Sequence, residues 1–385
     1  MSQVTAVTHP ALLWCGITLA ALSMVYGVIA YVAISMRARS SRAALRDLPP
    51  VTILKPLCGA EPETYDCLHS FCDQAYPEFQ VVFGVADLND PAVAIVERLQ
   101  REFPQRDLGL AVDRRLHGSS RKVSNLINMM QLVRHDFLVL SDSDVRVQHD
   151  YLARVVAPLL DSGVGIVTCA YRGCPRRGLW SLLGSLFINE WFMPSVRVAA
   201  IAGSRSFAFG ATIAIRRQVL ASIGGFTSIA NQLADDYRLG ELTRLMGLRT
   251  VLSDVVVDIC VAERSLGQLV RHELRWLRTI RALRPLGYGL SFITFGVPVA
   301  ALGVLLTGGT ATAVGMLAIT ALARLMLHLS AREPGSNSFQ IFVLPLRDVL
   351  SISLWAWSFV TRRVHWREDS YRVTRDGSAQ PVVRT

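Results

Sequence analysis

The chain has 385 residues, of which 51% are hydrophobic, and its formal net charge is +10. This length allows one large or two ordinary domains, and so apolar a composition argues against a wholly soluble protein. The positive charge indicates an anionic partner, such as a phospholipid surface, a nucleic acid or a phosphorylated substrate. The seven cysteines show no C-x-x-C spacing, which predicts reduced thiols in a cytoplasmic setting rather than a zinc site or a disulfide framework.

A membrane anchor is predicted over residues 11–36, after a short extracytoplasmic N-terminus at residues 1–10. No charged residue occurs from Ala11 to Met36, so the run exceeds the roughly 20 residues that cross a bilayer. It is also too long for the core of a signal peptide, and no basic residue precedes it. Arginines follow in a basic, proline-containing linker over residues 37–50. The positive-inside rule therefore places the following polar region in the cytoplasm.

Strands and helices are predicted to alternate through residues 51–264. Expected strands cover 51–56, 79–85, 108–112, 137–140, 165–170, 207–215, 249–252 and 255–261, and expected helices cover 65–74, 92–102, 124–133, 151–160 and 233–246. This alternation predicts an α/β domain with a largely parallel sheet, which binds ligands at the carboxyl ends of its strands. The aromatic segment 179–202 is interpreted either as a core helix or as an amphipathic helix resting on the membrane.

The C-terminal third predicts further membrane segments. A basic helix over 265–285 precedes an uncharged run that the Gly308-Gly309 pair divides into two predicted spans, 287–307 and 310–329. The next apolar segment, 339–360, carries two charged residues near its middle. Their cost inside a bilayer favours a kinked or interfacial helix over a third span.

A basic tail over residues 361–385 is expected to remain cytoplasmic. Basic residues gather beside the apolar segments rather than along the whole chain. Anionic lipid headgroups explain this placement, so no nucleic-acid partner is predicted.

Carboxylates stand just after two of the predicted strands. Asp142 and Asp144 follow strand 137–140, and Asp87 follows strand 79–85. Residues two apart in an extended chain face the same side, so the first two can share a site suited to a hard divalent cation carrying a phosphate. A solvated turn is the alternative. Asp235 and Asp236 stand where a helix is predicted to begin, so a role as helix cap remains open for them.

The order of these motifs carries a family resemblance. After Asp87, the Asp-Ser-Asp of 142–144 and the Asp-Asp of 235–236 comes His-Glu-Leu-Arg-Trp at 272–276, followed by apolar segments. In this the chain resembles the inverting family 2-like glycosyltransferases with the glycosyltransferase-A fold. It is most similar to their ceramide glucosyltransferase branch, and there to the bacterial hopanoid biosynthesis-associated glycosyltransferases. The shared motifs are K-P-L-C-G-A-E-P, R-K-V-S-N-L-I-N, L-F-I-N-E-W-F, L-A-D-D-Y and H-E-L-R-W-x-R-T-I-R, within roughly residues 50–290.

The resemblance implies roles for the residues that bind the donor. Asp87 matches an acid that contacts the uracil and ribose, and Lys122 matches a basic residue near the nucleotide and its diphosphate. Asp144, supported by Asp142, matches the acids that hold Mg²⁺ or Mn²⁺ between the two phosphates. The ceramide glucosyltransferase branch is not uniform at the second of these acids, which this chain retains.

The same resemblance implies residues for the transfer itself. Asp236 matches the general base that deprotonates the attacking hydroxyl, and the neighbouring charge of Asp235 would raise its proton affinity. Arg275 and Trp276 match the terminal motif, where an arginine lies near the leaving diphosphate and an indole beside a sugar or acceptor. His272 departs from the glutamine or arginine of that motif, although a histidine can still donate to phosphate. An amphipathic basic helix on the membrane surface is the alternative interpretation of this segment.

Together these residues predict a metal-dependent hexosyltransferase that moves a sugar from a UDP-sugar to a membrane lipid hydroxyl. The resemblance implies UDP-N-acetylglucosamine or UDP-glucose as the donor. The resemblance implies a hopanoid polyol as the acceptor, within a multi-pass protein of the bacterial inner (plasma) membrane whose catalytic domain faces the cytoplasm. A ceramide glucosyltransferase is the alternative enzyme. A non-catalytic basic scaffold on anionic phospholipid is the alternative from another class, although it would not require acids at several strand ends.

Overall fold

The computed structural model describes residues 9–36, 48–176, 178–204, 207–332, 339–361, 363–366, 369–374 and 378–381. The chain divides into two compact units. The sheet unit comprises residues 38–176, 204–262 and 365–385, and the helical unit comprises residues 1–37, 177–203 and 263–364. Most of the predicted linker 37–50 and much of the predicted tail 361–385 lie outside the described residues.

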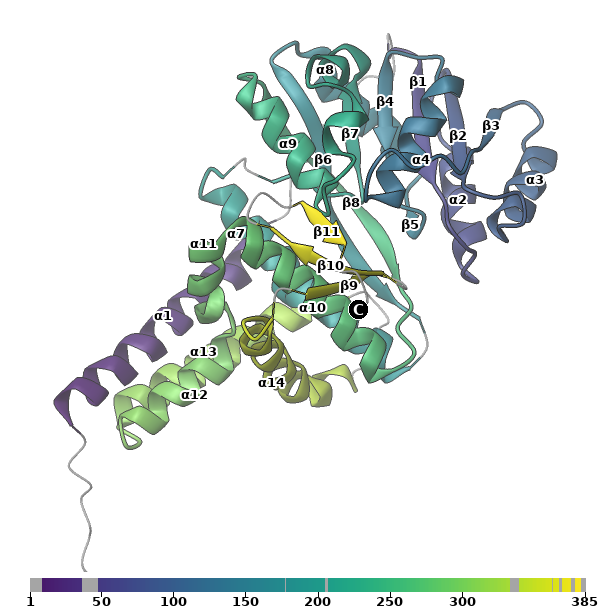
Figure 1. The fold of residues 1–385 in the computed structure, drawn as a ribbon. Helices are drawn as coiled ribbons and strands as arrows, with labels where there is room; N and C mark the ends of the chain where they lie inside the picture. The colour runs from purple at the N-terminus through teal and green to yellow at the C-terminus, as the bar shows by residue number, and fades with distance from the viewer. Residues whose placement is uncertain are drawn as a thin grey trace, which may run out of the picture. The chain divides into compact units, whose positions relative to one another are not determined.

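The sheet unit is built on an eight-stranded mixed sheet in the order β3-β2-β1-β4-β7-β6-β8-β5 (Figure 1). The strands are β1 Val51–Pro56, β2 Phe79–Val85, β3 Asp107–Val112, β4 Phe137–Leu140, β5 Val145–Arg146, β6 Val164–Pro175, β7 Ile213–Arg216 and β8 Arg249–Val261. The first four neighbours, β3, β2, β1 and β4, are parallel, whereas β7 runs antiparallel to both β4 and β6. The predicted α/β class is confirmed, with antiparallel pairs inside an otherwise parallel sheet.

Short helices follow these strands in the sheet unit. They are α2 Thr64–Cys72, α3 Ala92–Glu102, α4 Arg121–Met129, α5 Tyr151–Val156, α8 Arg217–Ser222 and α9 Asp235–Leu245, with 3₁₀ turns η1 Met130–Leu132, η2 Ala157–Leu160 and η4 Phe226–Ile229. Leu126 and Met129 of α4 pack against Leu54, Val82 and Leu138 of the sheet in a fully buried core. Each such side chain contributes about 1.5–3 kcal/mol by leaving water. This packing holds the carboxyl ends of β1, β2 and β4 at one edge of the sheet.

Two predicted strands differ from the observed ones. The predicted strand 207–215 is regular only from Ile213, because the backbone before it bonds to side chains: the amide of Phe209 donates to the Thr168 hydroxyl. The predicted strands 249–252 and 255–261 form one strand, β8, which runs parallel to β6 through a register shift between Thr168 and Ala170. Near the C-terminus, β9 Arg363–Trp366 precedes β10 Asp369–Val373, which pairs antiparallel with β11 Ala379–Pro381.

Among its described residues, the helical unit contains three helices long and apolar enough to cross a membrane: α1 Pro10–Ser35, α13 Ala311–Ala331 and α14 Gln340–Ser358, with mean hydropathies of 2.1, 1.6 and 1.3. The predicted span 287–307 is not one straight helix. Its two halves, Pro285–Thr294 and Gly296–Leu306, meet at an angle of 76°, so the pair is a broken span or a re-entrant segment. The backbone leaves the helical region at Phe295 (φ −84°, ψ 63°), which produces the bend.

The remaining helices of this unit complete the bundle. They are α6 Leu179–Phe187, the π-helical turn η3 Ile188–Phe192, α7 Met193–Ile201, α10 Leu266–Leu283, α11 Pro285–Leu290, η5 Ser291–Thr294 and α12 Gly296–Leu306. Figure 1 shows α1, α12 and α13 side by side. A Cβ atom built on Gly16 of α1 would lie 2.7 Å from the carbonyl oxygen of Gly303 of α12. The two glycines therefore allow their backbones to touch, as small residues do between membrane helices.

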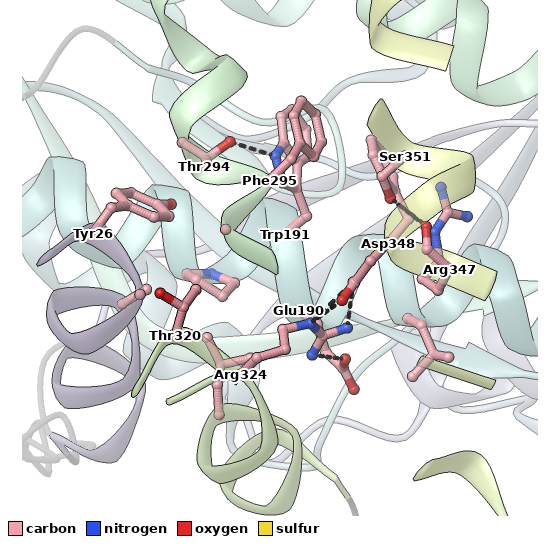
Figure 2. A pocket seen from close by; sticks show the side chains of 17 residues that line it. Tyr26, Glu190, Trp191, Thr294, Phe295, Thr320, Arg324, Arg347, Asp348 and Ser351 are labelled. Carbon is pink, nitrogen blue, oxygen red and sulfur yellow. Dashed lines mark hydrogen bonds and ion pairs between the residues drawn. The ribbon is translucent and has the colours of Figure 1, made fainter. Parts of the chain in front are cut away.

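The charged residues inside segment 339–360 are paired with partners on other helices. Arg347 of α14 forms two 2.7 Å bonds with Glu273 of α10, and the carboxylate of Asp348 lies 3.0 Å from Arg324 of α13 (Figure 2). These ion pairs offset much of the free-energy cost of placing charged side chains in a bilayer, which favoured an interfacial helix in the sequence analysis. Helix α14 also has the length and hydropathy of a membrane span. Segment 179–202 is likewise a helical part of the bundle, with the π-turn at its middle.

Candidate active site

The strand β4 ends at Leu140, and the chain then turns through Ser141 and Asp142 to the exposed Asp144. Lys55, near the end of the adjacent β1, lies directly behind this turn and is fully buried. Its ammonium donates to the carbonyl oxygen of Asp142 and, at 3.3 Å, to the hydroxyl of Ser141. The ammonium also lies 3.7 Å from the ring centroid of Phe71. Lys55 therefore fixes the backbone that presents the two predicted metal ligands.

Lys122 brings the second and third acidic motifs together. It lies in the first turn of α4, which begins where the Ser120 hydroxyl accepts a bond from the amide of Val123. Its ammonium lies 2.7 Å from Oδ1 of Asp142 and 3.1 Å from Oδ2 of Asp235. Burial alone would lower the pKa of Lys122, but the charges of these carboxylates outweigh burial and raise the pKa. The lysine thus remains charged between them.

Asp236 is held by backbone amides at the start of α9. Its Oδ2 accepts from the amide of Gly210 at 2.8 Å, and its Oδ1 accepts from the amide of Tyr237 at 2.7 Å. Burial and the like charge of the adjacent Asp235 raise the pKa of Asp236 to about 6, although Lys122 and the two amides oppose the rise. A carboxylate with this pKa is mostly ionised at neutral pH and accepts a proton more readily than an ordinary aspartate.

Gly210 lies at the centre of this cluster. A Cβ atom at this position would lie 3.2 Å from Oδ2 of Asp142, 3.3 Å from Nζ of Lys122 and 3.4 Å from Oδ2 of Asp236. Three charged groups from three different segments therefore meet around one glycine. Any side chain here would press on all of them, so the site requires a glycine for close approach.

The helix-cap alternative for the acidic pair is not supported. The N-cap residue of α9 is Ala234, and both acids lie in the first helical turn. Asp235 is buried and pairs with Lys122. The loop acid Asp90, by contrast, accepts bonds from the amides of Ala92 and Gly59 and stabilises the start of α3.

The donor set suits a divalent ion that arrives with a phosphate. Asp142 and Asp144 supply carboxylate oxygens, and no group of three or more acidic, histidine or cysteine side chains that could hold a metal occurs among the residues described. Mg²⁺ commonly binds through one or two carboxylates, with phosphates and waters completing its coordination. The pair therefore fits a shared protein–nucleotide metal site rather than a closed protein cage.

Asp87 follows β2 at the same edge of the sheet. Its Oδ1 accepts from the amide of Asn89 at 2.9 Å, and its Oδ2 lies 2.9 Å from Arg114. The Asn89 amide and the Arg114 charge lower the pKa of Asp87. The Asp87 carboxylate is therefore ionised at neutral pH and accepts hydrogen bonds. Its side chain is 46% exposed and accessible to a ligand.

The terminal motif lies in the helical unit, on α10. Nδ1 of His272 is 2.5 Å from Oε1 of Glu263, and the ring of Trp276 meets the imidazole edge to face at 5.1 Å. Arg275 is half-buried. The predicted amphipathic helix is therefore a packed helix: Leu269 and Leu277 are fully buried, and its Glu273 pairs with Arg347.

Sequence reasoning missed Lys55 and Gly210, and it did not foresee the contact of Asp235 with Lys122. Lys55 is a lysine inside an otherwise apolar strand, which is a detectable sign of a buried charge with partners. Gly210 was placed inside a strand, where nothing local marks it as a point of close approach. Asp235 was assigned to helix capping or to electrostatic support of Asp236, because its contact with Lys122 joins distant parts of the chain.

Comparison with known proteins identifies a family for most of the chain and relatives for parts of it. The family model described as Glycosyl transferase family 21 matches residues 15–379. Ceramide glucosyltransferase of Komagataella phaffii is 36% identical over 120 residues, which cover 29% of this chain and 24% of that protein. Ceramide glucosyltransferase 3 of Caenorhabditis elegans is 22% identical over 242 residues, which cover 62% of this chain and 52% of that protein. The matches thus span between a quarter and about half of the length of these relatives.

A solved structure supports the fold independently. The mannosyltransferase PcManGT from Pyrobaculum calidifontis, determined in complex with GDP-Man and Mn²⁺, aligns with a TM-score of 0.54 and 21% identity over 90% of this chain and 96% of that one. The predicted glycosyltransferase-A fold is confirmed.

Proposed function

The chain belongs to glycosyl transferase family 21, and on this premise we propose that it transfers a sugar from a UDP-sugar to a hydroxyl of a membrane lipid with inversion at the anomeric carbon. The observation that carries the proposal is the cluster of Asp142, Lys122, Asp235 and Asp236 around Gly210. It combines a basic carboxylate with a lysine and acids suited to a metal-bound diphosphate.

Asp236 is the proposed general base. Inversion in one displacement requires a carboxylate that takes the proton of the attacking hydroxyl as that oxygen bonds to the anomeric carbon. The two amides that hold Asp236 fix its orientation, and its raised pKa favours proton uptake. Asp235 supports this role through its charge.

The donor is proposed to bind along the edge of the sheet. Asp87 would accept from the uracil and ribose, and Lys122 would contact the diphosphate as a point charge. Asp142 and Asp144 would hold Mg²⁺ or Mn²⁺, which neutralises charge on the leaving diphosphate when bound. The solved relative holds Mn²⁺ together with a nucleotide sugar, which supports a metal role in this chain.

Arg275, Trp276 and His272, on α10 of the helical unit, are proposed to bind ligand through the terminal motif. Arginine suits bidentate binding of a phosphate, and an indole suits the face of a sugar or lipid ring. The bond of His272 with Glu263 orients the imidazole, so that Nε2 is its ring nitrogen for a ligand.

A lipid acceptor is proposed because the part of the chain that the structure describes contains three or four candidate spans. The resemblance noted from the sequence supports a hopanoid polyol, with N-acetylglucosamine or glucose as the sugar, in the plasma membrane of a bacterium. The relatives named as ceramide glucosyltransferases specifically favour a second candidate, glucosyl transfer to ceramide.

The test incubates the purified full-length protein with single UDP-sugars, Mn²⁺ and a lipid extract, and identifies glycosylated lipids by mass spectrometry. We expect a β-linked product from an α-linked donor, and loss of product by roughly 100-fold or more in Asp236→Asn. Asp107→Asn, which alters an exposed ion pair with Arg134 on the same unit, is the matched control and should retain activity. A product of retained configuration, or full activity in Asp236→Asn, would refute the assignment of the base.

A further inference from the structure

Two cysteine side chains of the sheet unit meet beside the turn that carries the proposed metal ligands. Sγ of Cys67 on α2 lies 3.5 Å from Sγ of Cys260 on β8, and both residues are free thiols. The two positions are 193 residues apart in the sequence, so the fold itself brings them together. Bonded sulfurs in a disulfide lie about 2.05 Å apart, so these two would have to approach by only about 1.5 Å. The proposed transfer chemistry uses neither thiol.

The elements that carry the pair also hold the turn with the metal ligands. The backbone amide of Cys260 donates to the carbonyl oxygen of Asp144 at 3.0 Å, so β8 fixes the residue proposed as the principal ligand. Just beyond it, the amide of Val147 donates to the hydroxyl of Ser70 on α2 at 3.1 Å. The turn is therefore anchored both to β8 and to α2. A covalent bond between Cys67 and Cys260 would join these same two elements.

The two thiols differ in how readily a solute reaches them. Cys67 is 1% exposed, whereas Cys260 is half-buried. A small oxidant therefore meets Cys260 first, and the sulfur of Cys67 already lies in contact with the atom that becomes oxidised. An accessible cysteine beside a second cysteine that resolves it is the arrangement of redox-sensing thiols. Disulfides in reducing compartments are usually transient ones of this kind.

We propose that Cys67 and Cys260 form a redox-sensitive pair, which a hydroperoxide converts into a disulfide that weakens metal binding by Asp142 and Asp144. In the first step the sulfur of Cys260 breaks the O–O bond of hydrogen peroxide, which yields a sulfenic acid and one water. In the second step the sulfur of Cys67 displaces the sulfenic hydroxyl group, which leaves with the thiol proton as a second water while the S–S bond forms. Two thiols are thus oxidised by two electrons as one peroxide is reduced, and a dithiol reductant reverses the change.

The effect on the metal site follows from the position of Cys260. Its sulfur and the amide that holds Asp144 belong to the same residue, so drawing the sulfur toward α2 displaces the bond to the Asp144 carbonyl oxygen. Loss of a partner that orients a metal ligand commonly lowers metal affinity roughly 10-fold to 100-fold. Formation of the disulfide depends on the two thiols alone, whereas this effect rests on the proposed function, which assigns the metal to Asp142 and Asp144.

Peptide mapping tests whether the bond forms. The full-length protein in detergent is treated with hydrogen peroxide, its remaining thiols are alkylated, and its peptides are analysed by mass spectrometry without reduction. We expect a cross-linked peptide pair containing Cys67 and Cys260, which dithiothreitol separates. Cys58→Ser, which removes an exposed thiol, should leave this cross-link intact. A bond from Cys260 to Cys174, its neighbour in the register of β6 and β8, or oxidation of Cys58 with the pair still reduced, would overturn the inference.

Two alanine variants of α2 separate the pair from buried cysteines in general. Cys67→Ala removes the resolving thiol, so oxidation should stop at a sulfenic acid on Cys260 that dimedone labels. Cys72→Ala makes the same change at another buried cysteine of the same helix and should still form the disulfide. Equal dimedone labelling of Cys260 in the two variants would contradict resolution by Cys67.

Binding of Mn²⁺ in the presence of UDP, measured by electron paramagnetic resonance on desalted samples, tests the consequence for the metal site. Oxidation should raise the apparent Kd for Mn²⁺ roughly 10-fold to 100-fold in the unsubstituted protein and in Cys72→Ala, but not in Cys67→Ala, and dithiothreitol should restore it. An unchanged Kd in cross-linked protein would overturn the inference and leave the proposed function intact. Reduced protein that binds no Mn²⁺ with UDP would instead refute the proposed function, while the mapped disulfide still decides whether the pair is redox-sensitive.

Discussion

The pKa of Asp236 gives a residue-scale prediction for the pH dependence of transfer. Because burial and Asp235 raise this pKa to about 6, the carboxyl group is protonated below that pH and cannot act as a base. We expect kcat/KM for the donor to rise with pH through about 6, since this parameter reports the free enzyme.

Asp235→Asn supplies the control for this profile. The substitution removes the charge of Asp235, which repels the Asp236 carboxylate and also pairs with Lys122. The positive charge of Lys122 then acts more strongly on Asp236. The pKa of Asp236, and with it the acidic limb of the profile, should therefore shift to lower pH. A limb that does not move would assign the titration to another group.

Gly210→Ala should disturb the cluster without disturbing the fold. The methyl group would lie within 3.2 to 3.4 Å of three charged atoms, and these must move by a few tenths of an ångström. We expect kcat to fall roughly 10-fold to 100-fold, because small misplacements of reacting groups are costly. Gly109→Ala in β3, whose nearest contact would be 3.6 Å, is the matched control and should retain kcat. Equal rates in both variants would exclude a need for close approach at Gly210.

The acids of the site were predictable because each follows a recognisable strand or opens a helix. Asp87, Asp142 and Asp236 are found at those positions. Their partners were not predictable, since the bond between Asp236 and Gly210 joins segments that only the folded sheet brings together. Lys55 was not predicted for the same reason, because its partner is the backbone of the turn that follows a different strand, β4.

At the scale of elements, breaking the buried pair between α10 and α14 should be strongly destabilising, because it leaves one buried charge without its partner. Arg347→Met leaves Glu273 buried and uncompensated, and we expect it to lower the free energy of unfolding by about 3–5 kcal/mol, measured as a fall in Tm in detergent. Replacing both residues with apolar ones should recover much of this loss. Arg134→Met, which breaks an exposed pair with Asp107, should cost only about 0–1 kcal/mol. Equal losses of unfolding free energy in Arg347→Met and Arg134→Met would show that burial of the pair does not increase the cost of breaking it.

Elements with local signals were predicted well, and those shaped by distant bonds were not. Helix α3 spans Ala92–Glu102 as predicted, because Asp90, Pro91 and an amphipathic pattern mark its start and its inward face. The bend at Phe295 was not predicted, since hydropathy records the length of an apolar run but not the direction of its helix axis. The strand predicted to begin at residue 207 is not regular there, because the backbone amide of Phe209 donates to the Thr168 hydroxyl.

At the scale of the whole molecule, the orientation in the membrane can be read from cysteine accessibility. Cys58 is exposed in the sheet unit, which the arginines after α1 predict to be cytoplasmic. A membrane-impermeant maleimide should label it only after intact cells are permeabilised, and Cys58→Ser should remove that signal. Thr312 is exposed at the start of α13, and a cysteine at this position reports on which side of the membrane the turn before α13 lies.

If the bent pair Pro285–Thr294 and Gly296–Leu306 forms one crossing, the turn before α13 lies outside the cell. Thr312→Cys in the Cys58→Ser background should then react in intact cells. If the pair is re-entrant, the same cysteine should react only after permeabilisation, because the chain would return to the side from which it entered. The prediction that residues 287–307 cross the membrane requires the first result, since a bend of 76° alone is compatible with either path.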